Sequence, residues 1–201
     1  MVIQNYLIFL LIFIIIKLIG LADLTGGVSE SISIKDSTDL YDVLSNLLTM
    51  TSINTAMVQN NKISKSQNNN CDRLPNGIVF NINYRVIRVD KVKTIDDDFV
   101  QLVKLRNPIG VSSDFIGSYK KEAIEWNKLL EEERERINFK QLIEGEFWMS
   151  FQEFIKTFTI LEVVHLDAET SKDEPTFYGL TPWHMRLLRG SWRKGNSSFF
   201  L

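Results

Sequence analysis

The 201-residue sequence has one cysteine, Cys71, and two histidines, His165 and His184. A single cysteine excludes both an intramolecular disulfide framework and a zinc site with several cysteine ligands, and it is typical of a reducing compartment. The scarcity of histidine restricts nucleophilic catalysis, because most such mechanisms need an imidazole beside the nucleophile. The 23 Lys and Arg nearly balance the 25 Asp and Glu, so no overall positive field favours nucleic acid as a partner.

Residues 1–22 form an apolar leader, in which positions 6–22 carry a single charge, that of Lys17. A bilayer crossing needs roughly 20 apolar residues, so the run is slightly short for a membrane helix. Three interpretations stay open: a membrane helix, a signal peptide, or a stretch that arises from a gene-model error. In each case we expect an N-terminal apolar helix that stands apart from the rest of the chain.

Hydrophobic periodicity after the leader predicts an α+β fold. Alternating or continuous apolar runs predict strands over 28–34, 77–92, 99–106 and 159–166. Helical spacing and capping residues predict helices that begin near residue 40, over 120–143, and over 150–158. Residues 59–70 are polar and without periodicity, which indicates a solvated loop. We therefore expect an antiparallel sheet with two or three flanking helices.

The strands 77–92 and 99–106 are separated by a turn-like break, which predicts a β-hairpin. If Val92 lies opposite Phe99, the same register places Asn107 opposite Tyr84. Ile82 is then diagonal to Asn107 on the same face, within roughly 8 Å.

Five motifs occur in one order along the chain: LVKLRNPIG (102–110), EWN (125–127), GEFWMSFQEF (145–154), FTILEV (158–163) and GSWRKG (190–195). Together with DLTGG (23–27) they resemble the second half of the catalytic domain of calpains, which are calcium-dependent cysteine endopeptidases with a papain-like active site. The resemblance implies that 23–166 is the second subdomain of that catalytic domain. It also implies that 167–201 is a linker followed by the truncated start of a β-sandwich domain.

The resemblance places Asn107 at the catalytic asparagine of the family and Ile82 at its catalytic histidine. Because isoleucine cannot accept a proton, we expect the chain to be inactive by itself and Asn107 to cap the end of its strand. The subdomain that carries the nucleophilic cysteine in calpains is not matched. Cys71 is interpreted as an inert thiol, and His165 and His184 as packing or surface residues.

The resemblance also implies calcium as a cofactor. It assigns as ligands Asp114, the carbonyl of Leu142, Glu144 and Glu146, and oxygen donors of this kind suit calcium. Lys121 stands where a further carboxylate is expected, and its ammonium would oppose a cation. The sequence therefore predicts weak calcium binding.

Three functions remain open at this point. The first is calpain-like intracellular proteolysis in the cytoplasm, with protein substrates or calpain-interacting proteins as partners. The second is a non-catalytic calpain fragment with an interaction or regulatory role. The third is a membrane-anchored or secreted protein that uses residues 6–22.

Overall fold

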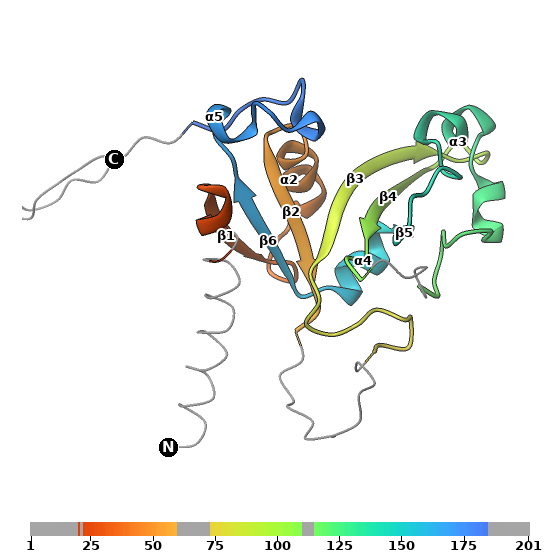
Figure 1. Ribbon diagram of the computed structural model, residues 1–201. Helices are drawn as coiled ribbons and strands as arrows, with labels where there is room; N and C mark the ends of the chain where they lie inside the picture. The colour runs from red at the N-terminus through yellow and green to blue at the C-terminus, as the bar shows by residue number, and fades with distance from the viewer. Residues whose placement is uncertain (1–19, 21, 60–72, 110–114, 185–201) are drawn as a thin grey trace, which may run out of the picture.

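A computed structural model describes residues 20, 22–59, 73–109 and 115–184 (Figure 1). The strands are β1 (Val28–Ser33), β2 (Ser52–Met57), β3 (Tyr84–Lys93), β4 (Phe99–Arg106), β5 (Glu146–Ser150) and β6 (Ile160–His165). The helices are α2 (Leu40–Leu47), α3 (Glu131–Ile137), α4 (Phe151–Thr157) and α5 (Ala168–Ser171), with 3-10 turns η1 (Ile124–Lys128) and η2 (Pro175–Phe177). The expected α+β class is confirmed.

The six strands form one curled antiparallel sheet in the order β1-β6-β2-β3-β4-β5. The expected leader helix lies outside the described residues. Within the ranges given above, no helix has the length and apolar character that a bilayer crossing requires.

The sheet consists of two halves joined by a short junction. In the first half, β6 pairs with β1 and with β2 over six residues each. In the second half, β3 pairs with β4 and β4 pairs with β5. Between the halves, β2 and β3 pair only at Thr55 with Arg85 and at Ala56 with Tyr84. Figure 1 shows the two strands diverging from this junction.

The main hydrophobic core spans the junction and is covered by α2 and α4. Helix α2 contributes its buried leucines, and α4 begins where the Ser150 hydroxyl accepts a hydrogen bond from the Glu153 N–H at 3.2 Å. The Tyr84 ring contacts Phe147 and Phe158 edge-on at centroid distances of 6.1 and 5.6 Å. Aromatic side chains from both halves therefore hold the sheet together where its strand pairing is shortest.

A second core lies under the segment 120–143. It contains buried Val92, Leu102, Tyr119, Trp126, Leu129, Ile137 and Trp148. The predicted helix over 120–143 is confirmed only in part, because two short helical elements, η1 and α3, form there. Ala123 and Leu129 are extended at the two ends of η1, and Asn138 ends α3 in the left-handed region at φ 52°.

The predicted hairpin of β3 and β4 is confirmed, with two corrections. The strand begins at Tyr84 and not at Gly77, because positive φ angles at Gly77 and Asn81 interrupt the extended backbone. At the turn, Phe99 lies opposite Lys93 and not Val92. An irregularity between Val86 and Arg88 shifts the register by one residue, so that Arg85 lies opposite Arg106.

Candidate functional site

Asn107 directly follows β4 and is held by two hydrogen bonds. Its backbone N–H donates to the Gly145 carbonyl at 2.9 Å, which joins it to the loop before β5. Its side-chain Oδ1 accepts from the Ile109 N–H at 3.1 Å. This is an Asx turn around Pro108, and it uses the amide oxygen locally. The arrangement fits the strand-end role expected from the sequence.

Ile82 lies in the irregular segment before β3 and is half-buried against the main core. Its aliphatic side chain offers no proton acceptor at the position where the calpain resemblance expects an imidazole. Because the strand does not extend to residue 82, the 8 Å separation from Asn107 stays a prediction.

His165 ends β6 in the first half of the sheet and is 4% exposed. Its Nε2 lies 2.9 Å from Glu30 Oε1, and its ring stacks on Trp183 with centroids 4.0 Å apart. The strands β2 and β3 lie between β6 and β4, so three interstrand spacings of about 4.8 Å separate His165 from the strand that precedes Asn107. His184 is exposed and follows Trp183. Neither imidazole is therefore positioned to act with Asn107.

A buried carboxylate in the first half was not foreseen from the sequence. Glu162 is 3% exposed in the middle of β6, and its Oε2 accepts from Asn83 Nδ2 at 2.6 Å. Asn83 Nδ2 also reaches Thr55 Oγ1 at 3.5 Å, so this group fastens the segment before β3 to the neighbouring strands. The signal in the sequence was one acidic residue inside the apolar run FTILEV.

The residues assigned to calcium do not form a site in the described part of the chain. Lys104 Nζ lies 2.6 Å from Glu146 Oε2, which also accepts from the Ile143 N–H at 3.2 Å. Lys104 donates as well to the Gln141 carbonyl at 3.3 Å, and Glu144 is exposed.

Asp114 lies outside the described residues, and Leu142 is half-buried beside the second core. No group of three or more His, Cys, Asp and Glu side chains that could hold a metal occurs among the residues that the structure describes. The lysine ammonium pairs with Glu146 and opposes a cation there, and the assignment of these four residues to calcium stays a prediction.

Comparison with known proteins identifies the family. A family model described as calpain family cysteine protease matches residues 16–165. The chain belongs to the calpain family. It is 38% identical over 182 residues to calpain-C of Drosophila melanogaster, which covers 88% of this chain and 26% of that protein. It is 28% identical to calpain-9 of Rattus norvegicus over 180 residues, which covers 89% of this chain and 25% of the relative.

The catalytic subunit of calpain-1 from Mus musculus is 30% identical over 177 residues, which covers 88% of this chain and 23% of the relative. The chain thus spans about a quarter of the length of these calpains. The matched range includes Asn107 and Ile82. The catalytic position of Asn107 stays a prediction from the calpain resemblance, and no hydrogen bond joins Asn107 to a histidine among the described residues.

Proposed function

We propose that this calpain-family chain does not hydrolyse peptide bonds and acts by binding other proteins. One observation carries the proposal: the Asn107 side chain is bonded to its own turn, and the residue that the calpain resemblance aligns with the imidazole is Ile82. A thiol needs a base to take its proton, and the amide orients that base without replacing it. A cysteine supplied by another part of a longer protein would still lack this base, since both histidines of the chain lie elsewhere.

An activity assay tests the proposal directly. The full chain is incubated with a fluorogenic calpain peptide, with and without calcium, beside an active calpain as positive control. Loss of one catalytic triad member typically lowers the rate by about 10⁴-fold or more, so we expect no turnover above buffer. We expect Asn107→Ala to change nothing, with circular dichroism confirming that the variant folds. Turnover that Asn107→Ala abolishes would refute the proposal.

Calcium regulation is common to the family by resemblance, and for this chain we propose that calcium binding is weak. The support is the ion pair between Lys104 and Glu146. A ligand that binds only the folded chain raises its stability in proportion to ln(1 + [L]/Kd). We therefore expect calcium at about 1 mM to raise the melting temperature by less than about 1 °C, no more than magnesium does. A rise of several degrees at micromolar calcium would contradict this expectation.

For location and partners, we propose a cytoplasmic protein that contacts protein ligands and not nucleic acid. The single cysteine and the near-balance of charge support this choice. The alternative is a membrane or secretory role through residues 6–22. Fractionation of a tagged full-length chain separates the two: a processed or membrane-bound product would favour the alternative.

A further inference from the structure

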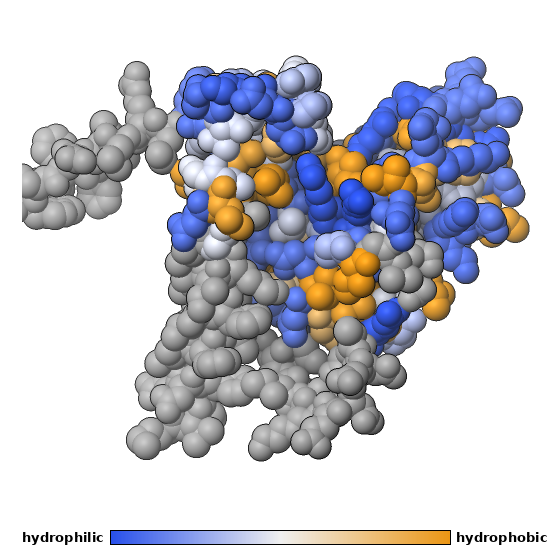
Figure 2. Space-filling view, in the orientation of Figure 1, coloured by the Kyte–Doolittle hydropathy of each residue, from blue (hydrophilic) through white to orange (hydrophobic). Residues whose placement is uncertain are grey.

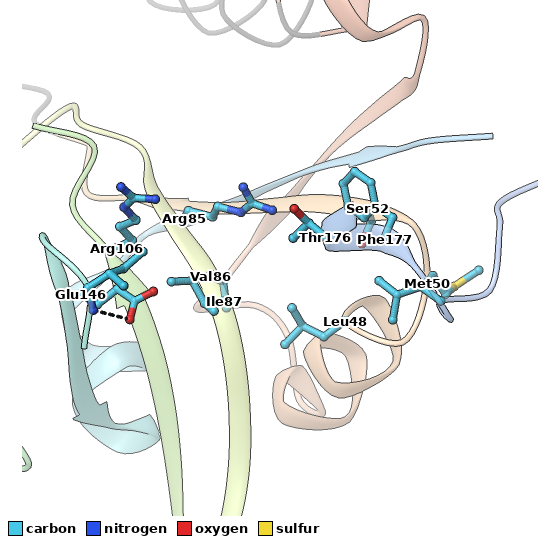
Figure 3. Close-up of a pocket in the computed structure, with 12 residues that line it drawn as sticks. Leu48, Met50, Ser52, Arg85, Val86, Ile87, Arg106, Glu146, Thr176 and Phe177 are labelled. Atoms are coloured by element: carbon cyan, nitrogen blue, oxygen red, sulfur yellow. Dashed lines mark hydrogen bonds between the residues drawn. The ribbon is translucent and has the colours of Figure 1, made fainter. Parts of the chain in front are cut away.

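A cavity of about 480 Å³ opens where the two halves of the sheet diverge. Leu48, Met50, Phe177 and Leu180 give it an apolar side that belongs to the first half. Arg85, Arg106 and Glu146 belong to the second half. Figure 3 shows the two arginines on one side of this space and Met50 and Phe177 on the other. Figure 2 shows hydrophilic and hydrophobic surfaces side by side near the centre of the face that it draws.

The two arginines occupy directly opposite positions on β3 and β4. Like charges at opposite positions of an antiparallel pair are destabilising, so this placement calls for a negative group between or above them. Both side chains are exposed, and within the described ranges neither guanidinium has a carboxylate at ion-pair distance. Two exposed cations that line the cavity thus have no direct ion pair among the described residues.

Two acidic side chains lie nearby, and each has another partner. Glu146 is paired with Lys104. Glu174 accepts hydrogen bonds from the backbone and the hydroxyl of Thr176. Neither carboxylate forms an ion pair with Arg85 or Arg106, although the positive charge of Arg85 is near enough to Glu174 to help lower the pKa of that carboxyl group, after the hydrogen bonds from Thr176.

We propose that this cavity binds an acidic polypeptide segment in which a carboxylate side chain alternates with an aliphatic one. Arg85 and Arg106 would bind the carboxylate, because guanidinium groups donate paired hydrogen bonds to it. Leu48, Met50 and Phe177 would contact the aliphatic neighbour. A free inorganic anion would bind the arginines and leave the apolar side exposed. A peptide would contact both sides of the cavity, which favours a peptide as the ligand. The proposal specifies a surface for the binding role above, but it rests on no assumption about catalysis.

The test measures the anisotropy of a fluorescein-labelled octapeptide of alternating Glu and Leu, titrated with the full chain. We expect saturable binding that weakens at least about tenfold in Arg85→Glu with Arg106→Glu, as loss of charge-assisted hydrogen bonds implies. The matched control is Lys91→Glu with Lys128→Glu, which makes the same change in net charge at exposed sites outside the cavity. We expect this control to change the affinity by less than about twofold at 0.15 M salt.

Two further measurements, and two outcomes of the titration above, can overturn the proposal. The same peptide with Gln in place of Glu should not bind, and inorganic phosphate at 10-fold the peptide's own dissociation constant should not displace the acidic peptide. Phosphate that competes as strongly as the peptide would mean a simple anion site. Equal losses in the arginine and lysine variants, or no binding by the parent chain, would also refute the proposal. A conservative pair, Arg85→Gln with Arg106→Gln, keeps the test valid if charge reversal impairs folding, which melting curves would reveal.

Discussion

In the first half of the sheet two buried ionisable side chains have polar neighbours, whereas at the junction the second half places two exposed arginines opposite each other. Glu162 bonds to Asn83 in the first case, and His165 lies against Glu30 and Trp183. In the second case Arg85 and Arg106 face each other across two strands. Glu162 and His165 thus have protein partners, while Arg85 and Arg106 are the groups that the proposed peptide would bind.

This contrast also separates the residues that a cysteine protease would need together. The buried imidazole belongs to the first half, and Asn107 follows the central strand of the second. The two halves meet at only two residue pairs, Thr55 with Arg85 and Ala56 with Tyr84, and diverge beyond them. Conversion of His165 into a partner of Asn107 would require a different strand order, so the fold itself opposes catalysis by this pair.

The largest effect is expected at the junction between the halves. Tyr84 is 1% exposed, and its hydroxyl accepts a hydrogen bond from the Val79 N–H at 3.0 Å. Tyr84→Ala removes an aromatic ring that contacts both halves and leaves a cavity in its place. We therefore expect a loss of about 4 kcal/mol in the free energy of unfolding.

The control for this change is Tyr84→Phe, which keeps the ring contacts and removes only the hydroxyl. Its expected cost is about 1 kcal/mol. Both are measured by urea denaturation. Similar losses in the two variants would show that the hydrogen bond, and not the ring, joins the halves.

A smaller effect is expected where the second half holds Asn107. Gly145 has φ +82°, and a Cβ there would lie 2.6 Å from the Asn107 carbonyl oxygen. Gly179, beyond the first half, has nearly the same φ of +83°, but a Cβ added there would meet no neighbouring atom within 4 Å. Both alanine variants incur a left-handed backbone cost of about 1–2 kcal/mol. Gly145→Ala should cost about 1–3 kcal/mol more, because the contact with Asn107 must relax.

Thermal unfolding of the two alanine variants measures the extra cost at Gly145 directly, because the two glycines have nearly the same φ and the backbone cost cancels. NMR of the Asn107 side-chain amide adds a local readout, which we expect to shift in Gly145→Ala alone. Equal melting temperatures would mean that the loop before β5 moves freely from Asn107.

Sequence patterns predicted β4 and β6 almost to the residue, because each is a run of apolar or alternating side chains with clear ends. The strand β2 was missed, since its sequence SINTAM shows no such pattern. Two of its polar side chains find partners in the fold: Ser52 Oγ donates to the Leu47 carbonyl at 2.7 Å and accepts from Asn54 Nδ2 at 2.9 Å. Contacts of this kind are invisible to local periodicity.

At the candidate site too, sequence motifs predicted the local features, whereas contacts between residues far apart in the sequence were not predicted. Asn107 and Ile82 were found through motifs, and the turn at Asn107 follows from the dipeptide Asn-Pro. Its bond to Gly145 joins residues far apart in the sequence, and so does the pairing of Lys104 with Glu146. The overestimated helix over 120–143 has a related cause, because Trp126 Nε1 donates to the Lys120 carbonyl at 2.9 Å and tertiary packing overrides helix propensity.

The smallest expected effects come from two carboxylates, one beside each half of the sheet, whose ionisation should change the stability of the chain in opposite directions. Burial raises the pKa of Glu153 on α4, beside the second half, and this outweighs the hydrogen bond from the Ser118 N–H. The hydrogen bond from the Thr170 N–H lowers the pKa of Asp167, which caps α5 beyond the first half. When folding raises the pKa of a carboxyl group, ionisation of that group at higher pH destabilises the folded chain. When folding lowers the pKa, the ionised group stabilises the folded chain, and this stability is lost as the pH falls through the lowered pKa.

Substitution of each carboxylate by its amide tests these signs, because Gln and Asn keep an accepting oxygen and remove the charge. Glu153→Gln should raise the melting temperature at pH 7 by about 1–2 °C, and Asp167→Asn should lower it. The Glu153 difference should vanish near pH 3, where that carboxyl group is protonated, whereas the Asp167 difference should persist to lower pH because the pKa of Asp167 is lowered. Melting curves between about pH 3 and pH 7 measure this. Equal signs for the two variants would contradict the distinction between a buried carboxylate and a capping one.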